Sequence, residues 1–216
     1  YVTRLAADSR FQTDASYRRE LLWDLGTRMT WEGSVSPSTV SAIAGRIESV
    51  FGDPNRKVRF RSSSNVEDAL EFSGAGLYTS TSVCAADGLD GDLSGPSHCD
   101  SSSTEERTIE RGLKTVWAST YNARAWDERE FYQIPEMQVS MAVLVTEAFS
   151  DEVANGVAFT GVPDTPNDER YLINAQHGDE AVVGNESAIF PEKDLLALDT
   201  SGTVTSIFRV RSSVLS

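Results

Sequence analysis

Apolar residues recur every three to four positions in three stretches of the chain, which is the spacing of helices that bury one face. The predicted helices cover residues 16–30, residues 37–51 and a stretch from about 104 to 121 that continues to about 132. The side chains expected to face the core are Tyr17, Leu21, Leu22, Leu25, Met29, Ile43, Ile47, Val50, Phe51, Ile109, Leu113, Val116 and Trp117.

Residues with capping chemistry mark the ends of two of these helices. Ser36 can cap the second helix, Pro37 suits its first position, and Gly52 ends it. Ser103 and Glu106 have the spacing of a capping box and predict that the third helix begins there.

Strand patterns dominate the rest of the chain. Residues 57–61 alternate charged and apolar side chains, as a half-buried strand does. Ser201-Gly202 reads as a hairpin turn. Further strands are predicted at residues 139–145, 156–160, 171–174, 195–198 and 204–210. Helices followed by a mostly antiparallel sheet predict an α+β fold, and residues 82–103, rich in Ser, Asp and Gly, predict a surface loop.

Charge and hydropathy exclude two classes of function. Residues 1–61 carry ten basic and seven acidic side chains, whereas residues 62–216 carry nine and twenty-six. A nucleic-acid-binding protein needs a basic surface, so we expect no nucleic-acid partner. We also expect no membrane partner, because no apolar run approaches the roughly 18 residues of a spanning helix. The chain begins at Tyr1 without Met or a signal core, which favours a processed product or a piece of a longer protein.

The two cysteines leave two alternatives open. Cys84 and Cys99 lie fifteen positions apart, and only His98 stands nearby as a further metal ligand. A disulfide between them would indicate an oxidising compartment, whereas two free thiols would fit a cytosolic loop.

The densest candidate for phosphate binding is Arg61-Ser62-Ser63-Ser64, at the end of a predicted strand. Arginine offers a planar set of donors that suits phosphate oxygens, and hydroxyls add further donors. Gly74 and Gly76 follow, where the backbone could approach a polyphosphate closely. The alternative is a strand that leaves its sheet through ordinary turn chemistry. Neither a Walker A motif nor a G-x-G-x-x-G motif is present, and no G-x-S-x-G motif supports a nucleophilic triad.

A second candidate site gathers oxygen-bearing side chains after two predicted strands. Its members are Asp164, Gln176, Asp179 and Glu180. Mg²⁺ prefers such ligands and is usually held by one or two carboxylates together with substrate phosphates. The alternative is a set of turn acids. His177 lies in the same stretch and could accept a phosphoryl group, but a partly exposed loop histidine is the better interpretation.

Three motifs in the same order resemble the phosphoenolpyruvate synthase and pyruvate phosphate dikinase family. The first is Val58-Arg59-Phe60-Arg61-Ser62-Ser63-Ser64-Asn65-Val66-Glu67-Asp68 with Phe72-Ser73-Gly74-Ala75-Gly76. The second is Gly156-Val157-Ala158-Phe159-Thr160. The third is Tyr171-Leu172-Ile173-Asn174-Ala175-Gln176 with Glu180-Ala181-Val182-Val183.

The resemblance implies an ATP-grasp-type nucleotide-binding domain, present in part, whose two α+β subdomains hold ATP between them. In the family this domain binds MgATP and passes a phosphoryl group to a histidine on a separate swivelling domain. Arg61, Ser62, Ser63, Gly74 and Gly76 then correspond to the phosphate-binding segment, with Arg61 as the catalytic residue. Gln176 corresponds to an amide near metal and phosphates, Asp164 and Glu180 to metal-site acids, and Glu147 to the strand that contacts adenine.

Some family features are missing from these residues. The Gly-rich, Lys-bearing ATP segment and the phosphohistidine motif are absent, and residues 82–103 have no counterpart. We therefore expect a fragment of a multidomain enzyme, with an N-terminal subdomain at 1–81, an inserted loop at 82–103 and a C-terminal subdomain at 104–216. The alternatives are a non-catalytic module of the same fold and a secreted binding domain stapled by Cys84–Cys99. The family resemblance favours the cytoplasm, and a disulfide would favour an extracytoplasmic location.

Overall fold

The chain forms two compact units, Tyr1–Ala148 and Phe149–Ser216. We describe them separately, from a computed structural model. Its described residues are 1–66, 68–69, 72–74, 76–89, 91, 94–149, 152–163, 165, 167–177 and 191–211. These units do not coincide with the predicted subdomains, since strands on both sides of the predicted boundaries pair in one sheet of the first unit. The functional division at residues 81 and 103 stays a prediction.

The sheet of the first unit has the order β4-β1-β5, with both pairings antiparallel. Its strands are β1 (Lys57–Ser64), β4 (Thr81–Cys84) and β5 (Met141–Glu147). A short hairpin of β2 (Asp68–Ala69) and β3 (Phe72–Ser73) follows β1. Along β1, Val58 and Phe60 are fully buried, so the alternating arginines point to the opposite face.

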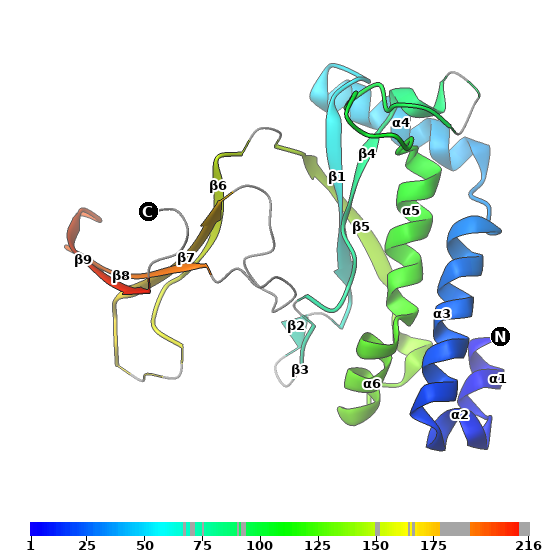
Figure 1. Ribbon diagram of the computed structural model, residues 1–216, viewed down its shortest axis with the longest axis horizontal. Coiled ribbons are helices and arrows are strands. Elements are labelled where there is room, and N and C mark those ends of the chain that lie inside the picture. Colours follow the sequence, from blue (N-terminus) through cyan, green and yellow to red (C-terminus); the bar gives the residue numbers. More distant parts are fainter. Residues whose placement is uncertain are drawn as a thin grey trace. The chain divides into compact units, whose positions relative to one another are not determined.

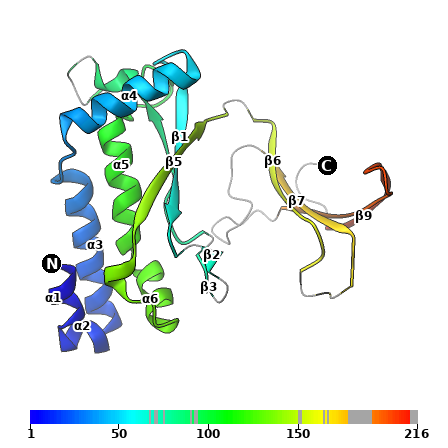
Figure 2. The ribbon, with the colours of Figure 1, turned by 180° about the vertical axis from the view of Figure 1, so that it is seen from behind.

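Helices cover the buried face of this sheet. Figures 1 and 2 both show α5 beside the sheet and α3 along the far side of α5. The α-helices are α1 (Val2–Ala6), α2 (Ser9–Thr13), α3 (Ala15–Trp31), α4 (Pro37–Phe51), α5 (Ile109–Ala118) and α6 (Ala123–Phe131). Three short 3₁₀ turns lie at η1 (Ala86–Gly88), η2 (Ser119–Tyr121) and η3 (Glu136–Gln138).

The main core lies between α5 and the sheet. Its buried members are Ile47, Val58, Phe60, Val83, Ala85, Ile109, Leu113 and Val116. Gly112 brings the helix unusually close to the sheet, because a Cβ at this position would collide with Val83 and press on Phe60. The predicted inward face of the third helix is therefore confirmed for its three aliphatic residues, and Trp117 packs partly buried against the same cluster.

A second cluster joins the N-terminal helices to α6. Its buried residues are Leu5, Phe11, Leu22 and Trp126, with Phe11 edge-on to Trp126 at 5.2 Å between ring centroids. Next to it, Arg129 is fully buried and holds Glu136 through two hydrogen bonds of 2.8 Å. Burial alone would lower the pKa of Arg129, but the carboxylate of Glu136 and the hydroxyl of Tyr78 raise it above its ordinary value.

The helix-end predictions had mixed outcomes. The bounds and caps of the second helix are confirmed, with the Ser36 hydroxyl accepting from the Thr39 amide, Pro37 at its start and Gly52 in the left-handed conformation at its end. The predicted burial of Val50 is wrong, since 54% of this residue is exposed. The Ser103–Glu106 capping box is also wrong, because α5 begins at Ile109 and the Thr108 hydroxyl caps the Arg111 amide.

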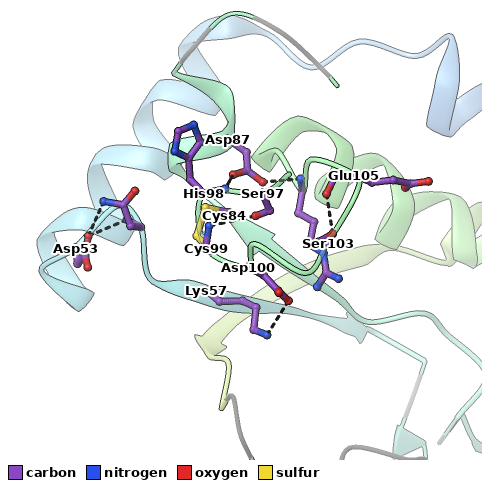
Figure 3. The surroundings of a disulfide bond; sticks show 12 residues. Asp53, Lys57, Cys84, Asp87, Ser97, His98, Cys99, Asp100, Ser103 and Glu105 are labelled. Atoms are coloured by element: carbon purple, nitrogen blue, oxygen red, sulfur yellow. Dashed lines mark hydrogen bonds and ion pairs between the residues drawn. A yellow bond between two sulfur atoms is a disulfide. The ribbon is translucent and has the colours of Figure 1, made fainter. Parts of the chain in front are cut away.

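The predicted surface loop at 82–103 is wrong at its start. Its first residues complete β4, where Val83 and Cys84 are fully buried. Cys84 and Cys99 form a disulfide, as Figure 3 shows. Beside it the buried carboxylate of Asp87 accepts hydrogen bonds from the amides of His98 and Arg107, each at 2.7 Å. The disulfide decides between the two thiol alternatives, and its link to an oxidising compartment stays a prediction.

The second unit contains an antiparallel sheet of order β6-β7-β8-β9. Its strands are β6 (Ala154–Phe159), β7 (Tyr171–His177), β8 (Glu192–Leu198) and β9 (Val204–Arg211). The predicted hairpin turn between the last two strands is confirmed, with Gly202 at φ 82°. Within the described residues, no helix is long and apolar enough to cross a bilayer.

Candidate functional site

The predicted phosphate-binding residues Arg61, Ser62 and Ser63 lie on β1, with Arg61 on the face of the sheet turned away from the helices. Arg61 is exposed there, and its Nε donates a hydrogen bond to the Thr146 hydroxyl at 3.2 Å. This contact comes from the neighbouring strand β5, on which Leu144 lies directly opposite Arg61. Within the described residues this is the one hydrogen bond of the guanidinium, so its remaining donors can serve a ligand.

The serines after Arg61 continue the pairing of β1 with β5. Ser62 lies opposite Val143 and Ser63 opposite Ala142. The Ser62 amide also donates to the Ser80 hydroxyl at 3.4 Å, which ties the end of β1 to the residues that lead into β4. The structure thus presents the motif on a regular strand rather than on an irregular turn.

The two predicted glycines belong to a tight turn that follows β3. The carbonyl of Gly74 accepts from the Leu77 amide at 3.0 Å, and Leu77 is buried beneath the turn. Gly76 has φ 75°, a left-handed conformation that side-chain-bearing residues rarely adopt. Gly76 is exposed, so its peptide is available to a ligand.

Glu147 ends β5 immediately before the boundary between the two units. Its carboxylate forms an ion pair with Arg56 at 3.0 Å. The next amide, that of Ala148, donates to the Lys57 carbonyl at 3.2 Å. The side chain of Glu147 is therefore engaged with a residue of the first unit. If this segment contacts adenine, it would do so through its main-chain groups.

Gln176 is the best-placed polar side chain of the second unit. It lies on β7, opposite Asn155 of β6, and only 2% of it is exposed. Among the described residues, neither Oε1 nor Nε2 of its amide has a hydrogen-bond partner. A buried amide without partners is expensive, and such groups in native proteins are commonly satisfied by a ligand or ion. An oxygen ligand of this kind suits Mg²⁺.

The two predicted metal-site acids, Asp164 and Glu180, lie outside the described residues, as does Asp179. His177 pairs through its backbone with Ala154 on β6, and its side chain is likewise outside the description. Among the residues that the structure does describe, no three His, Cys, Asp or Glu side chains gather as a metal site would require. The metal assignments therefore stay predictions.

The structure adds residues that sequence reasoning did not single out. Thr146 orients Arg61, and Ser80 holds the backbone of Ser62. The strand pairing that creates these contacts joins residues about 20 and 80 positions apart, so no local pattern indicates them. The alternation of β1 does indicate that Arg59 shares the face of Arg61.

Comparisons with known proteins give the chain a family context. A family model described as pyruvate phosphate dikinase, AMP/ATP-binding domain, matches residues 28–202, far more than half of the 216 residues. The phosphoenolpyruvate synthase of Aeropyrum pernix is 30% identical over 142 residues, which are 65% of this chain. The aligned part spans only 15% of that relative. With the observed helices and antiparallel sheets, the match confirms an α+β fold of the ATP-grasp-like type.

Proposed function

Because this chain belongs to the pyruvate phosphate dikinase AMP/ATP-binding domain family, we propose that it is the MgATP-binding part of a larger phosphotransferase. The observation that carries the proposal is the match over residues 28–202, which includes all three sequence motifs. In this proposal the phosphoryl group passes to a histidine on a separate domain. One of the two domains moves to bring the histidine to the ATP.

We assign to Arg61 the binding of the ATP phosphates. Phosphoryl transfer depends on positioning and on neutralising charge more than on covalent chemistry by the protein. An exposed guanidinium held by one bond to Thr146 supplies an oriented positive charge on a strand, and Ser62 and Ser63 follow it. The left-handed turn at Gly76 offers a backbone amide at a position without a side chain.

Gln176 is assigned to the metal and the phosphates. Its unpartnered amide oxygen fits a magnesium ion, and the amide nitrogen fits a phosphate oxygen. When bound, Mg²⁺ would neutralise phosphate charge during transfer. Asp164 and Glu180 complete the proposed metal site as carboxylate ligands.

The test is calorimetric titration of the chain with ATP, with and without Mg²⁺. Loss of a charge-assisted hydrogen bond in Arg61→Ala should weaken ATP binding by about 1.5–3 kcal/mol. Arg46→Ala is the matched control, since Arg46 is an exposed arginine on the far end of the helical layer, in α4. Equal affinity in both variants would remove Arg61 from the site.

The histidine acceptor needs a separate measurement. A longer form of the protein containing a candidate phosphohistidine domain should incorporate label from β-labelled ATP in an acid-labile form. Label that stays in nucleotide, in a protein that binds MgATP normally, would instead favour a nucleotide-binding module without turnover.

A further inference from the structure

A cavity of the first unit lies at the edge of its sheet, beside α5. It has a volume of about 560 Å³ and is enclosed by the edge of β4, the first turns of α5 and residues 102–107. This volume falls within the roughly 300–1,000 Å³ range typical of small-molecule sites. The cavity lining combines arginines with a dense set of hydroxyls, so it suits a polar ligand.

Three guanidinium groups line this cavity, from Arg59, Arg107 and Arg111. Arg111 is held rigidly, since it pairs with Glu105 at 2.6 Å and lies 4.8 Å from the centroid of the Trp31 ring. Arg59 reaches across the sheet edge and donates to the Ser82 hydroxyl at 3.2 Å. These two arginines are therefore positioned parts of the wall.

Arg107 differs from them because only its backbone is anchored. Its amide donates to Asp87 at 2.7 Å, and its carbonyl accepts from the Cys84 amide at 2.8 Å. Within the described part of the chain, its guanidinium makes no hydrogen bond and no ion pair. A positively charged group on a fixed backbone, lining a cavity and left uncompensated, is suited to an anion.

The rest of the lining indicates what the anion is attached to. Hydroxyls at positions 80–82, 102–104 and 115 offer both donors and acceptors. Glu105 and Glu106 also line the cavity. Carboxylates of this kind can accept hydrogen bonds from the hydroxyls of a ligand, and they repel a second negative group. The cavity is much larger than a phosphate ion needs. We propose that it binds a small phosphate ester with a hydroxyl-rich body, such as a sugar phosphate, and that Arg107 binds the phosphate.

The residues to which we assign ATP do not line this cavity. Six of its thirteen lining residues, 102–107, belong to none of the motifs that carry the family resemblance, and Arg59 is the one lining residue that stands in such a motif. Arg61 is not among the lining residues. The proposal therefore stands whether or not the chain binds MgATP.

The experiment is calorimetric titration with glucose 6-phosphate, with inorganic phosphate and glucose as separate arms. We expect glucose 6-phosphate to bind most tightly, phosphate more weakly and glucose least. Arg107→Ala should weaken the binding of glucose 6-phosphate about tenfold or more, because a charge-assisted contact is lost. Arg107→Lys should restore part of it, and Arg46→Ala should bind as the unchanged chain does.

Four outcomes would overturn the proposal. One is equal affinity in Arg107→Ala and the unchanged chain, and another is no binding at about 10 mM ligand by folded protein. If inorganic phosphate binds as tightly as glucose 6-phosphate, the cavity does not recognise the hydroxyl-rich part of the ligand. Loss of binding in Arg61→Ala would place the ligand in the nucleotide site. Circular dichroism of each variant identifies any that fails to fold, and Arg107→Lys then replaces Arg107→Ala.

Discussion

Replacing Gln176 with methionine should stabilise the second unit and at the same time weaken its metal-dependent ligand binding. In the part of the chain that the structure describes, the buried amide has no partner for either Oε1 or Nε2. Each unsatisfied buried group costs about 1–3 kcal/mol. Methionine has a similar unbranched shape and no group that needs a partner. We therefore expect Gln176→Met to raise the free energy of unfolding of this unit by about 1–3 kcal/mol.

The assay must observe the second unit specifically. All four tryptophans, Trp23, Trp31, Trp117 and Trp126, lie in the first unit, so their fluorescence does not report on β7. Amide hydrogen exchange of peptides covering Tyr171–His177 does. A stabilisation of about 1–3 kcal/mol corresponds to exchange slowed by about 5- to 150-fold for amides that exchange through unfolding. The tryptophan-monitored transition of the first unit should stay unchanged.

Gln138→Met provides the control. Gln138 is exposed, so the same substitution there should leave hydrogen exchange in β7 as it is. Faster exchange in Gln176→Met would show that the amide has stabilising partners in the folded chain, and our reasoning from its burial would be refuted. Unchanged binding of MgATP by a folded Gln176→Met would remove Gln176 from the proposed metal site.

Three further predictions concern packing and charge. Glu136→Ala should lower the free energy of unfolding of the first unit by about 3–5 kcal/mol in urea titrations followed by fluorescence, because it leaves buried Arg129 uncompensated; a loss below about 1 kcal/mol would contradict this. Gly112→Ala should destabilise by about 1–3 kcal/mol through overpacking, whereas Gly45→Ala, with open space around it, should stabilise by up to about 1 kcal/mol; the same sign for both would refute the close packing. NMR titration should give Asp168 a pKa of about 2 instead of 3.8, and Arg170→Ala should raise this pKa toward the ordinary value, because the Arg170 side chain is the largest cause of the shift. Since this pKa is lowered in the folded chain, the ion pair stabilises above about pH 3.8, and the effect is lost as the pH falls through about 2.

The elements predicted best were those with capping or turn residues at their ends. For α4, the hydroxyl of Ser36, the fixed φ of Pro37 and the freedom of Gly52 are local properties of the chain, and the helix has the predicted bounds. The β8–β9 hairpin was predictable for the same reason, through Gly202.

The misjudged elements depend on partners distant in sequence. Val83 and Cys84 stand in a stretch rich in Ser, Asp and Gly, and only pairing with β1 makes them part of the core. Ser103 and Glu106 match a capping box, but Glu106 is buried against the start of α5 and Thr108 caps the helix instead. Local pattern does not reveal which of two adequate caps the tertiary packing selects.

The candidate site was predictable in its chemistry and only partly in its geometry. Arg61 and the serines were identified from residue type and position at a strand end. Their orientation by Thr146 depends on the antiparallel register of β1 and β5, which joins distant residues. The burial of Gln176 is equally hidden, because a glutamine near the end of a strand is expected to face solvent until the pairing of the whole sheet is known.

The contacts around the Cys84–Cys99 disulfide make the first unit a suitable scaffold for inserted peptides. The disulfide, the carboxylate of Asp87 and the ion pair of Lys57 with Asp100 all secure the two ends of the stretch that runs from residue 88 to residue 96. Sequence grafted between those ends should leave the sheet and its arginines undisturbed. An affinity tag or a dye-accepting loop placed there would give a label on the first unit alone, without altering either terminus.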